Sequence, residues 1–426
     1  MAQAALTATP AEIADATNLK AKLRRATARA RRNAFLMTAP LLIMLLITFI
    51  VPIGYMLFRS VDDPVVGMAA PLTAKALADW NAETGLPPED AYAAIVADLS
   101  RLRTSGTDGK ALIGRLATRL NFEQPGVRSV ITKTARKSTK LKEGPYKDAL
   151  IKINKKWGEP EIWATIQRLS APYTTVHFLA SLDLHYDVDG SIVSQPEVRR
   201  VYVTIWLRTL YVGGLVTLLG LLLGYPVAYL LANLPTRISN LLIILVLLPF
   251  WTSLLVRTTS WIVVLGQNGV LLETLAWLGL VSDDNRPQLI YNMTGTIVAM
   301  THILLPFMIL PLYSVMKGIS PTYMRAARSL GAAPAQAFIK VYMPQTIPGV
   351  GAGSILVFIL AIGYYITPAL VGGQRGTLIS NFIAFHMQKS LNWGFAAALG
   401  TILLLGVLVL YWFYDRIIGI NKMKLG

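Results

Sequence analysis

Long apolar segments separated by short polar loops dominate the chain from residue 200 onward, and one more apolar segment stands near its start. A membrane-spanning helix needs about 20 predominantly apolar residues. The alternation over about 10 residues that marks the strands of a membrane barrel is not seen. The pattern predicts an all-α polytopic membrane protein with six transmembrane helices. The six segments are 34–58, 209–234, 238–256 (apolar on to 265), 287–316, 341–374 and 390–414.

Basic residues are concentrated in the segments that would lie on one side of the membrane. With six spans beginning inside, the inner segments are 1–33, 234–237, 317–340 and 415–426, and they hold 15 Lys or Arg against three acidic residues. Cytoplasmic loops carry such an excess, so we expect both termini in the cytoplasm. The tail 1–33 is too long, and the apolar segment after it too extended, for a cleaved signal peptide.

One outer segment, 59–200, is long enough to be a small domain. Within it, 60–200 carries 19 Lys or Arg and 17 Asp or Glu, and such long domains cross the membrane regardless of charge. Pro88 precedes an expected helix with Ile95, Leu99 and Leu102 on one face. Further helices are expected over 145–157 and 160–169, and a turn at 187–190. We therefore expect a mainly helical extracytoplasmic insertion between the first two spans, and 201–426 forms the rest of the membrane core.

Composition supports a membrane protein and excludes several other classes. Hydrophobic residues make up 54% of the 426 residues and charged residues 15%, whereas soluble domains have about 45–50% and about 25%. The net charge of +17 lies largely beside apolar segments, which favours membrane anchoring over nucleic-acid binding. No cysteine is present, and the four histidines are scattered, so no metal site or enzyme active site is expected.

Arg257 is the one charge well within a predicted span. An ionisable residue inside a span indicates a functional site. The alternative is that the Arg257 side chain extends along its helix to the outer surface. Four large side chains with polar tips also lie in the spans: Trp251, Trp261, Tyr364 and Tyr365. Each of them either lines a substrate path or only packs against its neighbours. No Asp or Glu lies inside the six segments, which weakens, as an alternative, a proton- or ion-coupled secondary transporter.

Two pairs of glycines with a spacing of four lie within spans, at Gly220 and Gly224 and at Gly349 and Gly353. Small residues at this spacing let helix backbones approach closely. The approach is either internal packing or a seam with a second subunit. Prolines also interrupt the spans, which suits a moving protein better than an inert anchor: Pro226, Pro249, Pro306, Pro311 and Pro368.

The inner loop 317–344 has its own helical pattern. Ser320 and Pro321 open a helix that Gly331 ends, and a second short helix is expected over 334–343. The first helix has an apolar face of Ala326, Ala327 and Leu330, and the loop carries four basic residues and no acid. An exposed apolar face indicates a docking site for a partner. The alternative is an amphipathic helix lying on the lipid headgroups.

This loop resembles that of the membrane subunits of bacterial binding-protein-dependent ABC importers. Their loop has Glu-Ala-Ala, three residues, Gly, and a Pro some thirteen residues later. Ala326, Ala327, Gly331 and Pro344 stand at those positions here, and Arg325 replaces the glutamate. The segments 249–269, 305–314 and 363–373 are similar to the spermidine/putrescine subgroup. The resemblance covers about residues 200–414, and the long insertion departs from that subgroup.

The resemblance implies the type I ABC importer permease fold, in the inner membrane, with a transport subunit that is not itself an enzyme. Two separate ATPase subunits would bind ATP and dock on 317–344, chiefly at Arg325, Ala326, Ala327, Leu330, Gly331 and Pro344. The chain contains no phosphate-binding G-x-x-x-x-G-K-[ST] loop of its own. A second permease subunit would complete the path, and a periplasmic binding protein would deliver the solute. The insertion is a candidate contact for that protein.

The implied solute is a polyamine such as spermidine or putrescine, or a related amine. Arg257 near the path favours a carboxylate- or phosphonate-bearing solute as the alternative. The other candidates for the path are the large side chains of Trp251, Trp261, Tyr364 and Tyr365.

Overall fold

The computed structural model describes residues 10–141, 143–282 and 285–418, and the chain divides into two units, Met1–Phe58 and Arg59–Gly426. The first unit contains α1 (Pro10–Leu45), a π-helical turn (Leu46–Ile50) and α2 (Val51–Arg59) except for its last residue, which begins the second unit. A candidate span, Ala26–Arg59, confirms the first predicted transmembrane helix. Of the basic tail 1–33, residues 1–9 and the side chains of 10–22 and 25 lie outside the described part, as does 419–426 at the other end.

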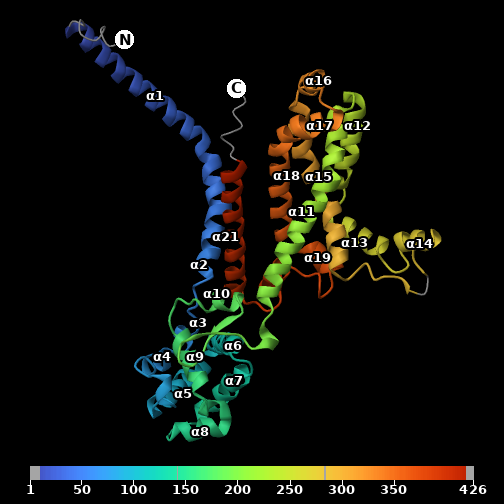
Figure 1. Ribbon diagram of the computed structural model, residues 1–426. Helices are drawn as coiled ribbons and strands as arrows, with labels where there is room; N and C mark the ends of the chain where they lie inside the picture. Colours follow the sequence, from blue (N-terminus) through green and yellow to red (C-terminus); the bar gives the residue numbers. More distant parts are fainter. Residues whose placement is uncertain (1–9, 142, 283–284, 419–426) are drawn as a thin grey trace. The chain divides into compact units, whose positions relative to one another are not determined.

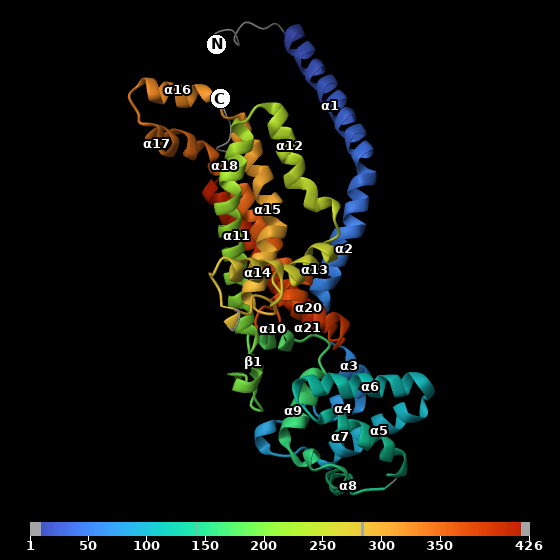
Figure 2. The same ribbon diagram turned by 90° about the vertical axis from the view of Figure 1, so that its right-hand side faces the viewer.

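Three long helices form the centre of the membrane core: α11 (Tyr202–Asn233), α15 (Met293–Gly318) and α18 (Met343–Gly363). They lie side by side in Figures 1 and 2. Their shared core includes Val216, Met300, Met308, Leu312 and Val357, all buried. α20 (Ile379–Gln388) and α21 (Trp393–Ile418) follow, and α21 is the last candidate span. The second, fourth and sixth predicted spans are therefore confirmed.

The third predicted span is broken. α12 (Thr236–Leu247) leads into a 3₁₀ turn (Leu248–Trp251), and α13 (Leu254–Val264) then leaves at 96°. Pro249 in the turn has no N–H to continue the helix, and the Ser253 side chain accepts a hydrogen bond from the Val256 N–H at 3.2 Å, starting α13 anew. The described part thus has five helices long and apolar enough to cross, or six if this bent pair is one span. α14 (Val270–Trp277) follows α13.

The fifth span is shorter at its end and longer at its start than the predicted 341–374. α18 ends at Gly363, and α19 (Ile366–Val371) is a separate short helix. At the other end, α17 (Pro334–Ala337) continues through a π-helical turn (Phe338–Tyr342) into α18, so that Pro334–Gly363 forms one candidate span. The expected short helix over 334–343 is therefore not a separate element.

The insertion is mainly helical and has a hydrophobic core of its own. Tyr92 and Trp163 meet edge to face, with ring centroids 4.5 Å apart. The Tyr92 hydroxyl donates to the Trp157 carbonyl at 3.0 Å, and the Trp157 indole N–H donates to Thr134 Oγ1 at 2.9 Å. The expected stripe of Ile95, Leu99 and Leu102 is buried against this cluster. Large apolar side chains with satisfied polar tips thus hold the insertion together.

The elements of the insertion follow the sequence expectations closely. The helix expected over 145–157 is instead α8 followed by a 3₁₀ turn, and the turn at 187–190 joins a two-stranded antiparallel hairpin in which Leu184 pairs with Ser194. The helices are α3 (Val65–Ala69), α4 (Pro71–Ala76), α5 (Glu89–Thr104), α6 (Gly106–Glu123), α7 (Val127–Lys137), α8 (Tyr146–Ile153), α9 (Pro160–Leu169) and α10 (Val176–Ser181). The strands are β1 (Leu184–Tyr186) and β2 (Ile192–Ser194), and the 3₁₀ turns are Ala82–Thr84, Ser138–Lys140, Lys155–Gly158 and Glu197–Arg199.

Candidate functional site

The helix α16 (Pro321–Ser329) has well-defined ends. Ser320 Oγ accepts a hydrogen bond from the Thr322 N–H at 3.3 Å, and Pro321 occupies the first turn, where no N–H is needed. At the other end Gly331 has a φ of +89°, and the Ala332 N–H reaches back to the Ala327 carbonyl at 3.1 Å. This is the Schellman arrangement, in which glycine avoids the Cβ strain of a left-handed residue. The Gly331 position thus fixes where α16 stops.

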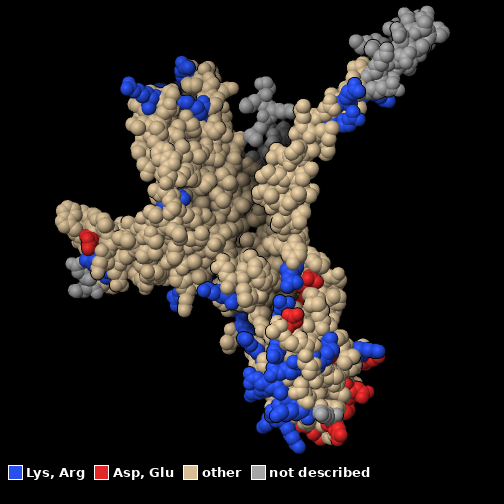
Figure 3. All heavy atoms as spheres, turned by 180° about the vertical axis from the view of Figure 1, so that it is seen from behind, with Lys and Arg blue, Asp and Glu red and all other residues tan. Residues whose placement is uncertain are grey.

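The candidate docking residues lie on the surface at the end of the core where α15 ends and α18 begins. Arg325, Ala326, Gly331 and Pro344 are exposed, Ala327 is half-buried, and Leu330 is 90% exposed. Figure 3 shows Lys and Arg gathered at the α16 end and few charges on the long helices. Leu330 is thus exposed at the end of a helix that also exposes Arg325 and Arg328. Five of the predicted docking residues therefore lie together on α16 and its C-terminal end, and Pro344 lies separately in the first turn of α18.

Aromatic packing fixes the second arm of this surface to the core. Phe338 stacks on Tyr342, and Tyr229 of α11 meets each of them edge to face, with ring centroids 5.4 and 5.3 Å away. Because α17 also runs into α18 without a break, a displacement of α17 is transmitted directly to a spanning helix. The surface is thus mechanically connected to the membrane core.

Three of the five predicted path residues lie together, near the bend between α12 and α13. The Arg257 guanidinium is close enough to His302 and Tyr364 to interact electrostatically with both. The Trp261 indole N–H donates to His302 Nδ1 at 3.2 Å, with the rings edge to face. His302 is the residue that the sequence reasoning missed; its only signal was being the one histidine in an apolar span. We refer to Arg257, Trp261, His302 and Tyr364 as the path cluster.

The remaining two path candidates lie apart from the path cluster. Trp251 is 76% exposed in the 3₁₀ turn before α13, and Tyr365 uses its backbone carbonyl to accept a hydrogen bond from Asn381 at 2.7 Å. A buried pair of hydroxyls, Thr258 and Thr367, 3.1 Å apart, joins α13 to α19 and so holds the path cluster in place.

Arg257 has unused hydrogen-bonding capacity. Its Nε is buried and, among the described residues, has no hydrogen-bond partner. The continuous helix along which Arg257 was expected to reach the surface is absent, because α13 begins only at Leu254. A buried donor without a partner is unfavourable by about 1–3 kcal/mol, which a bound polar group would relieve. Arg257 is therefore the member of the path cluster with a buried donor left for a further polar group.

The insertion is joined to the start of α11 through one carboxylate. Asp183 accepts hydrogen bonds from the backbone N–H groups of Val201, Tyr202 and Val203 at 3.1, 3.0 and 2.8 Å. These N–H groups form the first turn of α11 and have no partner within the helix. A buried side chain of the insertion thus caps the second span.

Comparison with known proteins gives a consistent result. The family model described as binding-protein-dependent transport system inner membrane component matches residues 218–418. The spermidine/putrescine transport system permease protein PotB of Salmonella typhimurium is 37% identical over 222 residues, which cover 51% of this chain and 77% of the relative. PotB of Escherichia coli is 36% identical over 228 residues, covering 53% and 82%. PotB of Haemophilus influenzae is 35% identical over 227 residues, covering 53% and 79%.

Among solved structures, the chain is similar to one of a bacterial alginate ABC transporter in complex with a periplasmic protein bound to an alginate pentasaccharide. The sequence identity is 18% and the TM-score 0.44, and the match covers 53% of this chain and 81% of that one.

Proposed function

The chain belongs to the family of binding-protein-dependent transport system inner membrane components, and from this premise we propose that it is the permease subunit of an ATP-driven importer that takes up a polyamine. The family makes it a multi-pass inner membrane transport component of an ABC importer. The proposal adds the energy source, the partners, the solute and the orientation, with both termini in the cytoplasm.

The exposed helix α16 is the observation that carries the proposal. Its end is fixed by Gly331, Leu330 stands 90% exposed beyond its last turn, and the second arm continues into α18. An ATPase subunit that binds this surface acts on α18 directly. ATP-driven closure of two such subunits would rock the spans between inward-open and outward-open states, and a periplasmic binding protein would deliver the solute. A second permease subunit would complete the path.

A tagged chain purified gently from native membranes tests the docking surface. Leu330→Asp places a charge on the docking surface without disturbing the core, because Leu330 is exposed. Leu280→Asp is the matched control, since Leu280 is also an exposed leucine, 70% accessible, but lies in the loop after α14. We expect the ATPase subunit to co-purify with the wild type and with Leu280→Asp, and to be lost from Leu330→Asp. Equal recovery with both variants contradicts docking at α16.

Similarity to spermidine/putrescine permeases supports a polyamine as the solute. In the path cluster, Trp261 can hold an alkylammonium group against its ring face, since aromatic faces attract cations. The cluster has no carboxylate, so selectivity for a cation would come from the binding protein or from the second permease subunit. Trp261→Ala is then expected to reduce uptake of putrescine and spermidine, and Trp251→Ala, outside the path cluster, is the control.

A carboxylate- or phosphonate-bearing solute is the second candidate, and the unpartnered Nε of Arg257 favours it. Arginine binds such groups with paired hydrogen bonds. Uptake of radiolabelled putrescine by the complete complex in proteoliposomes, with ATP inside, separates the two candidates. If the solute is a polyamine, we expect the wild type to take up putrescine and Arg257→Gln to retain that uptake. If uptake needs no ATP and stops when an ion gradient is collapsed, the chain is not part of an ATP-driven importer. That result would support an ion-coupled secondary transporter instead.

A further inference from the structure

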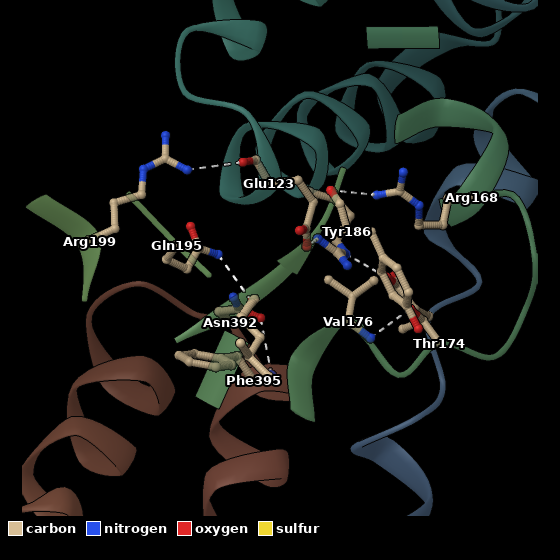
Figure 4. A network of polar contacts seen from close by, with 12 residues as sticks. Glu123, Arg168, Thr174, Val176, Tyr186, Gln195, Arg199, Asn392 and Phe395 are labelled. Atoms are coloured by element: carbon tan, nitrogen blue, oxygen red, sulfur yellow. Dashed lines mark hydrogen bonds and ion pairs between the residues drawn. The ribbon is translucent and has the colours of Figure 1, made fainter. Parts of the chain in front are cut away.

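A cavity of about 890 Å³ lies where the insertion meets the turn between α20 and α21. The insertion contributes charged side chains from the end of α2, from α6 and from α7. The α20–α21 turn contributes Leu391, Asn392, Trp393 and Gly394. Figure 4 shows two contacts near this junction: Arg199 donates a hydrogen bond to the Glu123 carbonyl within the insertion, and the Phe395 N–H donates to Asn392 at the start of α21. The path cluster contributes no residue to this cavity.

Arginines dominate the charged lining. Arg59, Arg115, Arg119 and Arg128 line the cavity against two aspartates, Asp62 and Asp63. Both aspartates are already engaged, because Asp62 pairs with Arg59 at 3.0 Å and Asp63 pairs with Arg119 at 2.5 Å. Arg115 and Arg128 make no ion pair within the described part of the chain, and both are exposed to the cavity side of the insertion. Two arginines therefore remain free to bind an anion.

Arg119 supplies a third donor from inside the wall. This residue is only 6% exposed, and its Nε and Nη1 contact Asp63 and Glu123. Its Nη2 is buried and has no hydrogen-bond partner among the described residues. An unsatisfied donor on a buried guanidinium is unfavourable, and an acceptor in the cavity would relieve it. The buried His177 in the same wall adds no further charge, because burial and the nearby Arg119 and Arg59 lower its pKa to about 3.

Apolar side chains of the α20–α21 turn line the cavity next to the first residue of a candidate span. Trp393 is the first residue of α21, a candidate span, and both Trp393 and Leu391 are exposed. Tryptophan is enriched at the membrane–water boundary, where one end of the ring is in lipid and the other in water. Arginine donors beside exposed apolar side chains at that depth match the headgroup and the first acyl carbons of a phospholipid.

From these observations we propose that the cavity between α6, α7 and the α20–α21 turn binds a phosphate group, with Arg115, Arg119 and Arg128 as its donors and an anionic phospholipid headgroup as its source. The bound phosphate ties the insertion to the start of α21. Guanidinium groups are suited to this because their paired N–H donors match phosphate oxygens.

Native mass spectrometry of the full chain with its co-purifying subunits tests the site. The protein in mild detergent is offered phosphatidylglycerol or phosphatidylcholine with identical acyl chains. The test variant is Arg115→Gln/Arg128→Gln, and the matched control is Lys133→Gln/Arg136→Gln, which removes two exposed charges from α7 outside the cavity. We expect phosphatidylglycerol to bind in preference to phosphatidylcholine. The test variant should lose at least about tenfold in affinity, since each lost hydrogen bond to a charged group is worth about that much.

Inorganic phosphate, followed by thermal shift, distinguishes the two sources of the phosphate group. If phosphatidylglycerol binds and inorganic phosphate does not, the source is lipid, and Trp393→Ser should weaken that binding. If inorganic phosphate alone stabilises the wild type and not Arg115→Gln/Arg128→Gln, the site takes free phosphate. Equal binding of both lipids, or equal losses in the test and control variants, overturns the proposal. The proposal is also overturned if the thermal shift shows stabilisation by an acidic binding protein but by neither phosphatidylglycerol nor inorganic phosphate.

Discussion

The sulfur of Met308 in α15 lies against Gly353 in α18, so closely that a Cβ on Gly353 would stand 2.8 Å from it. Gly224 of α11 approaches the same Met308 side chain, where a Cβ would be 3.1 Å from its Cγ. Both glycine pairs of the sequence are thus used inside the chain, to let α11 and α18 close on α15. Internal packing, and not a seam with a second subunit, is the role the structure gives them.

Gly353→Ala should destabilise the core by about 1–3 kcal/mol, because the added methyl group meets the Met308 sulfur and its carbonyl oxygen, 3.2 Å away. The midpoint of thermal unfolding in detergent measures this. Gly214→Ala is the control, since a Cβ on Gly214 of α11 meets nothing within 4 Å. Met308→Ala should partly rescue Gly353→Ala by vacating the space. Without such rescue, the clash is not with this side chain.

Asp183→Ala should destabilise the start of α11 by at least about 1–2 kcal/mol, the usual effect of losing a capping side chain. Three backbone N–H groups, at Val201, Tyr202 and Val203, lose their acceptor at once. Amide hydrogen exchange of 201–205 should become faster. Asp189→Ala serves as the control, because Asp189 caps only the exposed hairpin turn at Ser191. Unchanged exchange at 201–205 would show that water replaces the carboxylate.

His177 should make the junction sensitive to acid. Burial, together with Arg119 and Arg59, lowers its pKa from 6.5 to about 3, so the unfolded chain binds a proton between these values while the folded chain does not. Stability is therefore complete above pH 6.5 and falls as the pH drops toward 3, by at most about 1.4 kcal/mol per unit.

His177→Gln should flatten this dependence, because it removes the titrating group while keeping a polar side chain. Unfolding midpoints of the wild type and His177→Gln between pH 4 and pH 8 measure it. If both curves fall in parallel below pH 6.5, another group is responsible.

Gly331→Ala should weaken ATPase docking more than it weakens the fold. At φ +89° an alanine is strained by roughly 1 kcal/mol, and the end of α16 can relax because it is exposed. Gly331→Asn is the control, since asparagine tolerates left-handed backbone better than other residues with a side chain. The amount of ATPase that co-purifies should be highest with glycine at position 331, lower with asparagine and lowest with alanine. Full recovery of the ATPase with alanine would show that the end of α16 is not part of the contact.

Arg325→Glu should reverse a charge contact with the ATPase subunit. Arg325 is exposed on α16 and makes no ion pair within the described residues, so the change leaves the fold intact. The loop 317–344 carries four basic residues and no acid, which calls for an acidic partner surface. The ATPase should dissociate at lower salt from Arg325→Glu than from the wild type, and Arg136→Glu on the insertion should have no effect. An unchanged salt dependence would contradict a charged contact at Arg325.

Apolar length was sufficient to predict the long helices of the membrane core. A segment such as 209–234 is long and apolar enough to span a membrane, and α11 forms over it as expected. The start and end of the helix between Ser320 and Gly331 could also be predicted from the sequence, because capping residues and a glycine at a left-handed position act locally. The burial of Ile95, Leu99 and Leu102 in α5 also followed from their spacing.

The sequence by itself therefore determined which long segments are helices, which of them are apolar enough to span a membrane, and where α16 starts and stops, since these depend on neighbouring residues along the chain. Tertiary structure alone decided the bend after Pro249, because a proline in an apolar segment permits a kink without requiring one. It also decided the meeting of Trp261 with His302, of Asp183 with α11, and of the arginines at the insertion with the α20–α21 turn. These contacts join residues far apart in the chain, and only packing determines which side chains face each other.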